Sequence, residues 1–130
     1  MVCLHTSFLI APIRRDPNAE KKLEEYITSE AKISTTPITA CELFKGAYRS
    51  GKNANVATVR KLLAYLEMLG FSVGACERYG KLVNELLFKG SPIGDLDTMI
   101  ASIALAHGEP LLTLDKEHFV RVPGLMVDTW

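Results

Sequence analysis

Four side chains, His5, Glu42, Asp97 and Asp115, could together bind a divalent metal ion. Each stands just after an expected strand or in an early turn of an expected helix. In an open parallel α/β sheet such positions meet at the carboxyl edge of the strands, where ligands collect. Carboxylates crowded there repel one another unless a cation neutralises them, and oxygen ligands suit Mg²⁺ or Mn²⁺. A metal held in this way activates water for phosphodiester hydrolysis.

Each acid also has an ordinary structural explanation. A carboxylate in the first turn of a helix, such as Asp97, is stabilised by the helix dipole by roughly 0.3–1 kcal/mol. Asp95 fits the N-cap of that helix better, which leaves Asp97 needing another role. Asp115 could cap the short helix after it, and Glu42 could pair with a basic residue of its own helix. The metal site is therefore predicted from the four positions together.

The segments that would position these side chains alternate between strands and helices. Short apolar runs predict strands at 2–4, 32–36, 71–73, 110–113 and 125–127. Helices are expected in the segment closed by Pro12, from Asp16 onward, at 37–50, 55–69 and 75–89, from Asp95 to a cap at Gly108, and at 116–120. Without tight hairpin signals, this series predicts an α/β fold, a three-layer α/β/α sandwich with a parallel sheet of four or five strands.

Apolar periodicity predicts which side chains are buried. The helix that Asp16 opens should bury Ala19, Leu23, Tyr26 and Ile27. The helix at 75–89 should turn inward Tyr79, Leu82, Val83, Leu86 and Leu87. The helix after Asp95 is almost wholly apolar, so it should be buried on most sides. We also expect reduced core thiols at Cys3, Cys41 and Cys76.

The composition is that of an ordinary globular domain. Of the 130 residues, 48% are apolar and 23% are charged, so a single domain over 1–130 can bury a sizeable core. The longest apolar runs fall far short of the roughly 20 residues that a membrane-spanning helix needs. The N-terminal segment does not follow the secretory signal pattern. We therefore expect a cytoplasmic protein with no membrane partner.

Charge is balanced over the whole chain but uneven along it. The formal net charge is zero, so the molecule as a whole does not attract nucleic acid. The segment 43–66, however, contains no acid and five basic residues, Lys45, Arg49, Lys52, Arg60 and Lys61. The first three are candidates for contacts with RNA phosphates, and a solvated helix face is the alternative.

Four strings of the sequence, in their order along the chain, resemble the PIN-domain ribonucleases. They are VCLHTSFLI, ITACELFKGAY, PIGDLDTMIASIALAHG and PLLTLDKEHF. The short single-domain form resembles the VapC toxins of type II toxin–antitoxin pairs in prokaryotes. The resemblance covers essentially the whole chain, and its most specific part is Asp97 before an apolar helix with Asp115 after Thr113.

This resemblance implies an endoribonuclease that depends on Mg²⁺ or Mn²⁺, with Glu42, Asp97 and Asp115 as its acids. It also implies that Asp95 supports the site, and that hydroxyls at two further positions hold ligands or water, namely Ser7 and Thr113. As partners it implies an RNA substrate, a second copy of the chain, and a small antitoxin that presents a basic side chain to the acidic site.

His5 departs from the family pattern, which places an aspartate at this position. A neutral imidazole offers one nitrogen and no charge, so Mg²⁺ affinity should fall, whereas manganese, cobalt or nickel would tolerate the change better. We therefore hypothesise a correctly folded PIN domain with weakened ribonuclease activity. The other two histidines, His107 and His118, are expected to be structural.

Two other classes of function compete with this interpretation. A catalytically inactive PIN-like domain could bind RNA or an antitoxin without cutting, because phosphate contacts need basic residues but not catalysis. A phospho-acceptor signalling domain has similar length and fold class. That class needs an acidic pair after the first strand and an aspartate after the middle strand, and neither is present.

Overall fold

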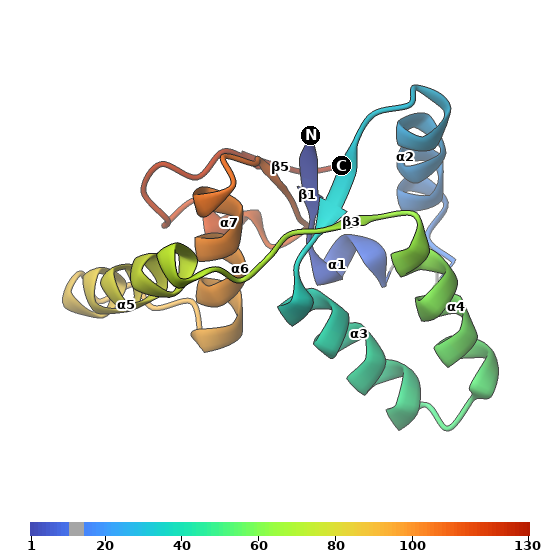
Figure 1. Ribbon diagram of the computed structural model, residues 1–130, viewed down its shortest axis with the longest axis horizontal. Helices are drawn as coiled ribbons and strands as arrows, with labels where there is room; N and C mark the ends of the chain where they lie inside the picture. Colours follow the sequence, from blue (N-terminus) through green and yellow to red (C-terminus); the bar gives the residue numbers. More distant parts are fainter. Residues whose placement is uncertain (11–14) are drawn as a thin grey trace.

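The computed structural model describes residues 1–10 and 15–130, and its elements alternate along the chain (Figure 1). The strands are β1 (Val2–Leu4), β2 (Ile33–Thr35), β3 (Glu67–Met68), β4 (Leu111–Leu112) and β5 (Val127–Asp128). The helices are α1 (Thr6–Leu9), α2 (Pro17–Thr28), α3 (Pro37–Arg49), α4 (Asn53–Ala64), α5 (Val73–Phe88), α6 (Asp95–Ala106) and α7 (Lys116–Phe119). The expected Pro12 end of the first helix lies outside the described residues.

The strands form one five-stranded parallel sheet in the order β3-β2-β1-β4-β5. In its centre, Val2 of β1 pairs with Ile33 of β2, and Cys3 pairs with Leu111 of β4. The order of the strands reverses between β1 and β4, which creates a switch point where ligands collect in open α/β sheets. The predicted parallel α/β architecture is confirmed.

Adjacent strand residues point to opposite faces of the sheet, and each face has its own core. Cys3 and Leu111 pack with α5, α6 and α7, whereas Leu4 and Leu112 pack with α1 to α4. Figure 1 shows these two groups of helices on opposite sides of the strands. As expected, α6 is buried on most sides, with Ile100, Ala101, Ile103 and Ala104 fully buried.

The third strand is not where the sequence predicted it. Helix α4 ends at Ala64, and β3 is Glu67–Met68 instead of 71–73. Leu66 and Leu69 are buried on either side of it, and the Leu69 N–H donates to Thr35 O at 2.8 Å. Pairing with β2 therefore outweighs the helical pattern. Val73 instead begins α5, whose N-cap is Ser72.

Some expected core positions are exposed. Ile27 and Leu87 are 48% and 59% exposed, although the apolar pattern placed both on the inward face. Cys41 and Cys76 are exposed as well, and only Cys3 is the predicted buried thiol. Burial, together with the charge of Glu109, raises the pKa of Cys3 to about 12.

The first residues of α2 and α6 show whether Asp16 and Asp95 cap these helices. Asp16 caps α2 as predicted, accepting from the N–H groups of Asn18 and Ala19. The prediction that Asp95 caps α6 is wrong, since the N-cap is Gly94 and no side chain caps it. Gly94 adopts a φ of +93°, and the Thr98 hydroxyl donates to its carbonyl oxygen at 2.6 Å.

Within the described ranges no helix has the length and apolarity to cross a membrane.

Candidate metal centre

The ends of β1 and β4 bring His5 and Thr113 side by side. Leu4 is the register partner of Leu112, and the His5 N–H donates to Leu112 O at 3.0 Å. His5 is also the N-cap of α1, where its ring accepts weakly from the Ser7 N–H at 3.4 Å. The neighbouring strands thus place His5 at the switch point of the sheet, as the sequence predicted.

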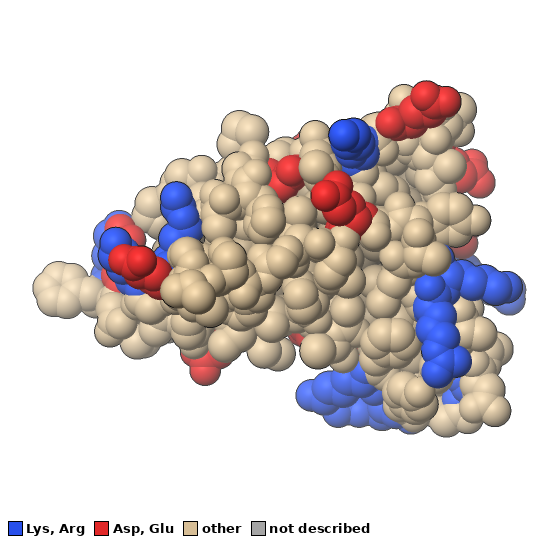
Figure 2. Space-filling view, viewed as in Figure 1, with Lys and Arg blue, Asp and Glu red and all other residues tan. Residues whose placement is uncertain are grey.

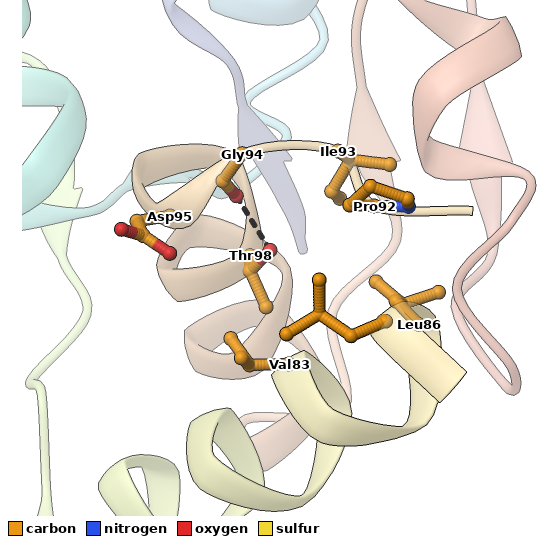
Figure 3. A pocket seen from close by; sticks show the side chains of 8 residues that line it. Val83, Leu86, Pro92, Ile93, Gly94, Asp95 and Thr98 are labelled. Carbon is orange, nitrogen blue, oxygen red and sulfur yellow. Dashed lines mark hydrogen bonds between the residues drawn. The ribbon is translucent and has the colours of Figure 1, made fainter. Parts of the chain in front are cut away.

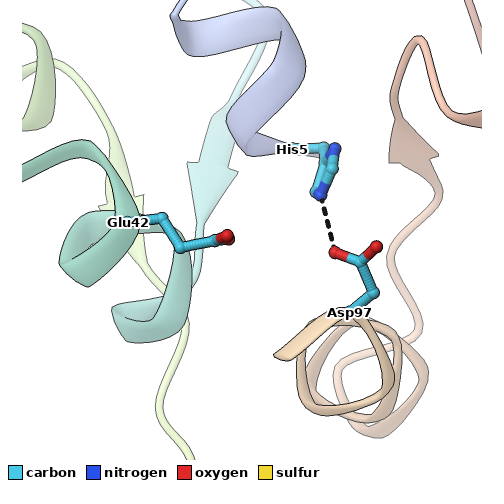
Figure 4. Close-up of side chains that lie close together, drawn as sticks. All are labelled: His5, Glu42 and Asp97. Atoms are coloured by element: carbon cyan, nitrogen blue, oxygen red, sulfur yellow. Dashed lines mark hydrogen bonds and ion pairs between the residues drawn. The ribbon is translucent and has the colours of Figure 1, made fainter. Parts of the chain in front are cut away.

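Both ring nitrogens of His5 have polar side-chain partners. Nε2 lies 3.2 Å from Asp97 Oδ1, as Figure 4 shows, and Nδ1 lies 2.9 Å from the Thr113 hydroxyl and 3.0 Å from the Ser7 hydroxyl. Phe119 packs edge-on against the ring with centroids 4.9 Å apart. His5 is only 4% exposed, so its orientation is set by these contacts.

The hydroxyls behind His5 form a network with the backbone. Ser7 Oγ accepts from the Leu114 N–H at 3.0 Å, and Thr113 Oγ1 accepts from the Asp115 N–H at 2.9 Å. The two hydroxyl oxygens lie 3.2 Å apart. Because the Ser7 N–H also points at Nδ1, this nitrogen is the acceptor, and Nε2 carries the hydrogen donated to Asp97. Ser7 and Thr113 therefore contact His5, and they orient its ring.

Glu42 reaches the same place from the other face of the sheet. Its Oε1 accepts from the Thr6 hydroxyl at 2.8 Å, and the described residues include no ion pair of Glu42 with a base of its own helix. Donor atoms of His5, Glu42 and Asp97 all lie within 4.8 Å of one another. Figure 4 shows the Glu42 carboxylate directed toward the His5–Asp97 pair.

Asp115 lies at the edge of this cluster. Its Oδ2 is 3.8 Å from His5 Nδ1, whereas Asp97 faces Nε2, and its side chain is 48% exposed. It occupies the N-cap position of α7 but makes no side-chain cap hydrogen bond, so capping does not account for it. The structure brings Asp115 to His5 but outside the tight group of donors.

One residue near the centre was missed by sequence reasoning. His118, expected to be structural, has Nδ1 3.8 Å from Asp97 Oδ2. The available signal was its position one helical turn after Asp115, which returns its side chain to the same edge of the sheet. His107, by contrast, bonds the Gly70 carbonyl oxygen at 3.0 Å, in agreement with a structural role.

Asp95 contacts a different part of the molecule. Its Oδ1 accepts from the Tyr79 hydroxyl at 3.4 Å, and partial burial together with this carboxylate raises the pKa of Tyr79. Asp95 stands at the edge of a small cavity of about 60 Å³ between α5 and α6, lined by residues such as Val83 and Leu86 (Figure 3). The structure therefore gives Asp95 no direct contact with the donors around Asp97.

The predicted RNA-contacting residues lie on one side of the molecule. Lys45 and Arg49 project from α3, and Lys52 lies in the turn before α4; all three are exposed. Figure 2 shows basic side chains gathered over α3 and α4. Since Glu42 also belongs to α3, this basic surface begins on the helix that carries one of the metal-site acids.

The sequence and the fold match a known family. The PIN-domain family model matches residues 2–125 of the chain. The chain belongs to the PIN-domain family. It is 31% identical over 128 residues to the tRNA(fMet)-specific endonuclease VapC of Salmonella typhimurium, covering 98% of this chain and 96% of that protein. It is also 31% identical, with the same coverage, to ribonuclease VapC2 of Rickettsia felis.

Solved structures agree with this assignment. The DNA-bound VapBC of Salmonella typhimurium superposes with a TM-score of 0.90 and 31% identity, covering 100% of this chain and 99% of that chain. VapBC2 from Rickettsia felis bound to a DNA fragment from their promoter gives a TM-score of 0.89 and 30% identity, again covering 100% and 99% of the two chains. The chain is thus a PIN domain of the VapC type.

The donor set of this PIN domain fits a divalent cation. Two carboxylates, of Glu42 and Asp97, and one imidazole offer donor atoms within 4.8 Å, with Asp115 and a second imidazole nearby. Mg²⁺ prefers a nearly complete set of oxygen ligands, whereas manganese and later transition metals accept nitrogen. The mixed nitrogen and oxygen donors are therefore better suited to the second group.

Proposed function

We propose that this chain is the toxin of a type II toxin–antitoxin pair, a metal-dependent endoribonuclease whose Mg²⁺-supported activity is weakened by His5. The VapC relatives, two of them named as nucleases specific for tRNA(fMet), support the reaction class. The weakening rests on one observation, the 3.2 Å contact between His5 Nε2 and Asp97 Oδ1.

The residues that would hold the ion are Asp97, Glu42 and His5, with Asp115 at the edge of the site. When bound, a divalent ion activates water and stabilises charge on the phosphate oxygens. The chain's own groups position this chemistry. Thr6 fixes the carboxylate of Glu42. The bases Lys45, Arg49 and Lys52 are suited to hold RNA phosphates through contacts that carry no sequence information.

His5 weakens the Mg²⁺ site for two reasons. It removes the negative charge that an aspartate would contribute, and its Nε2–H occupies an oxygen of Asp97 that would otherwise be free for the cation. The ring is also fixed from behind by hydroxyls at 2.9 and 3.0 Å, so it cannot turn away at low cost. Mg²⁺, which demands oxygen ligands in near-octahedral geometry, is the ion most affected.

The names of similar proteins suggest which RNA substrate and which protein partner to test. Initiator tRNA is the first RNA to test, because two relatives carry that specificity in their names. A small antitoxin is the proposed protein partner, since the similar structures are VapBC complexes. We further propose a homodimer that acts in the cytoplasm, where tRNA is found.

Cleavage assays of the wild-type chain and of His5→Asp test the proposal. With initiator tRNA and Mg²⁺, we expect His5→Asp to cut at least about tenfold faster, the scale of changes at metal sites. With Mn²⁺ the difference should shrink, because manganese accepts nitrogen. Equal Mg²⁺-supported rates would contradict the weakening. Absence of cleavage by both proteins across RNA substrates and both ions would contradict the nuclease.

An inactive domain that binds RNA or an antitoxin is the second candidate function. The hydrogen bond between Nε2 of His5 and Asp97 favours it, because this bond engages an acid of the cluster without a cation. The two candidates differ in one measurement. An inactive wild-type chain would bind tRNA in a salt-dependent manner and leave it intact with Mg²⁺ and with Mn²⁺.

A further inference from the structure

The carboxylate of Asp97 lies between two imidazoles. Its Oδ1 is 3.2 Å from His5 Nε2, and its Oδ2 is 3.8 Å from His118 Nδ1. The Asp97 side chain is 22% exposed and that of His118 is 49% exposed, so the pair is open to solvent ions on the His118 side. Glu42 approaches the same group from α3. One imidazole therefore lies among the two carboxylates, and a second imidazole borders Asp97.

The surroundings of His5 are those of a metal-binding histidine. In metal sites the ring nitrogen that does not bind the ion is held by an outer hydrogen bond, which fixes the ring orientation. Here Nδ1 has that bond, with hydroxyls of Thr113 and Ser7 at 2.9 and 3.0 Å. Without an ion, Nε2 donates to Asp97. For Nε2 to bind an ion, the ring hydrogen must move to Nδ1, where the hydroxyls of Thr113 and Ser7 can accept it.

We infer that this centre selects a transition-metal dication that prefers imidazole, of the class of Zn²⁺, Co²⁺ or Ni²⁺, over Mg²⁺. His5 supplies a nitrogen donor and Asp97 with Glu42 supplies oxygens. The exposed side chain of His118 can turn in to add a second nitrogen. This inference deepens the proposed function by naming the class of ion at the same site. Affinity for such N/O donor sets rises along the first-row series toward the later metals.

The preference for transition metals has two causes at position 5: a negative charge is lost and a nitrogen donor is gained. Relative to an aspartate, His5 lowers the negative charge of the set by one, which costs a hard ion such as Mg²⁺ the most. It adds a nitrogen that zinc, cobalt and nickel bind well. His118 adds a second nitrogen from a different element, α7, so the selectivity depends on two residues that can be changed separately.

Metal titrations of the full-length chain, without RNA and without a polyhistidine tag, test the inference. The exposed thiols of Cys41 and Cys76 are replaced by serine in all proteins, because they would bind zinc. Calorimetry gives affinities for Zn²⁺ and Mg²⁺, and visible absorption of added Co²⁺ reports nitrogen coordination. The variants are His5→Asp and His118→Gln, with His107→Gln as the matched control outside the site.

We expect the ratio of Zn²⁺ to Mg²⁺ affinity to fall by at least about tenfold in each site variant and to stay unchanged in the control. The Co²⁺ spectrum should change in the same two variants. Circular dichroism and thermal melting verify that each variant is folded. A wild-type chain that binds Mg²⁺ as tightly as Zn²⁺, or a ratio unaffected by both site variants, would overturn the inference.

The outcome is separable from that of the proposed nuclease. Selective Zn²⁺ binding without RNA cleavage under any ion supports this inference and contradicts the nuclease. Mg²⁺-supported cleavage by His5→Asp, together with no zinc preference in the wild-type chain, supports the nuclease and overturns this inference.

Discussion

The two sides of the metal centre are built differently. On one side, His5 and Asp97 are tied to Ser7 and Thr113 through a chain of hydrogen bonds that ends on backbone N–H groups. On the other side, Glu42 has one strong hydrogen bond within the described ranges, from the Thr6 hydroxyl at 2.8 Å. The first side is fixed before any ion arrives, whereas the second can adjust.

This difference follows from where the two sides are anchored. Asp97 belongs to α6, which packs on one face of the sheet, and Glu42 belongs to α3, whose buried Leu43 and Ala47 pack on the opposite face. The two helices also contact each other, and Ile38 of α3 packs against the core that contains α6. The fixed side should therefore determine which ion binds, and the adjustable side should determine how closely the site closes around it.

The largest effect is expected from Asp97→Asn, which removes the carboxylate charge at the centre of the donor group. In the His5→Asp background, cleavage of tRNA with Mg²⁺ should fall by more than the roughly 100-fold that loss of an outer metal-site partner costs. Initial cleavage rates measure it. Glu77→Gln on α5, which removes an exposed acid paired with Lys81, is the control and should leave the rate unchanged.

A smaller effect is expected from Thr113→Val on the fixed side. The valine keeps the shape of the side chain but removes the hydroxyl that orients His5, so Zn²⁺ affinity should fall by about tenfold. Calorimetry measures the affinity. Thr58→Val, which removes an exposed hydroxyl bonded to its own helix α4, is the matched control. Unchanged affinity in Thr113→Val would show that the network does not preorganise the ring.

The smallest effect is expected from Thr6→Val on the adjustable side. Glu42 is only half-buried, so water can replace the lost hydroxyl, and the net loss should be about 0.5 kcal/mol in metal binding, below the roughly 1.4 kcal/mol of a tenfold change. The same titration measures it. If the two sides are independent, the Thr6→Val and Thr113→Val losses should add within about 0.5 kcal/mol in the double variant. A loss from Thr6→Val that exceeds that from Thr113→Val would reverse the comparison.

Much of the fold could be predicted because local chemistry decides it. The cap at Asp16, the buried run of α6 and the strand at Val2–Leu4 follow from residue types and spacing. The third strand could not be predicted. Glu67–Met68 is too short and too polar to be recognised, and it becomes a strand only because β2 offers it backbone partners.

The sequence by itself determined the family, the parallel α/β sandwich and the candidate positions His5, Glu42, Asp97 and Asp115, because each of these depends on local pattern. Only the tertiary structure decided how the candidates are grouped. In the folded chain His118 lies beside Asp97, Asp115 lies at the edge of the donor group, and Asp95 contacts Tyr79 instead. The physical reason is that side-chain direction at the end of a strand or helix is set by packing between elements far apart in the sequence, which no local pattern encodes.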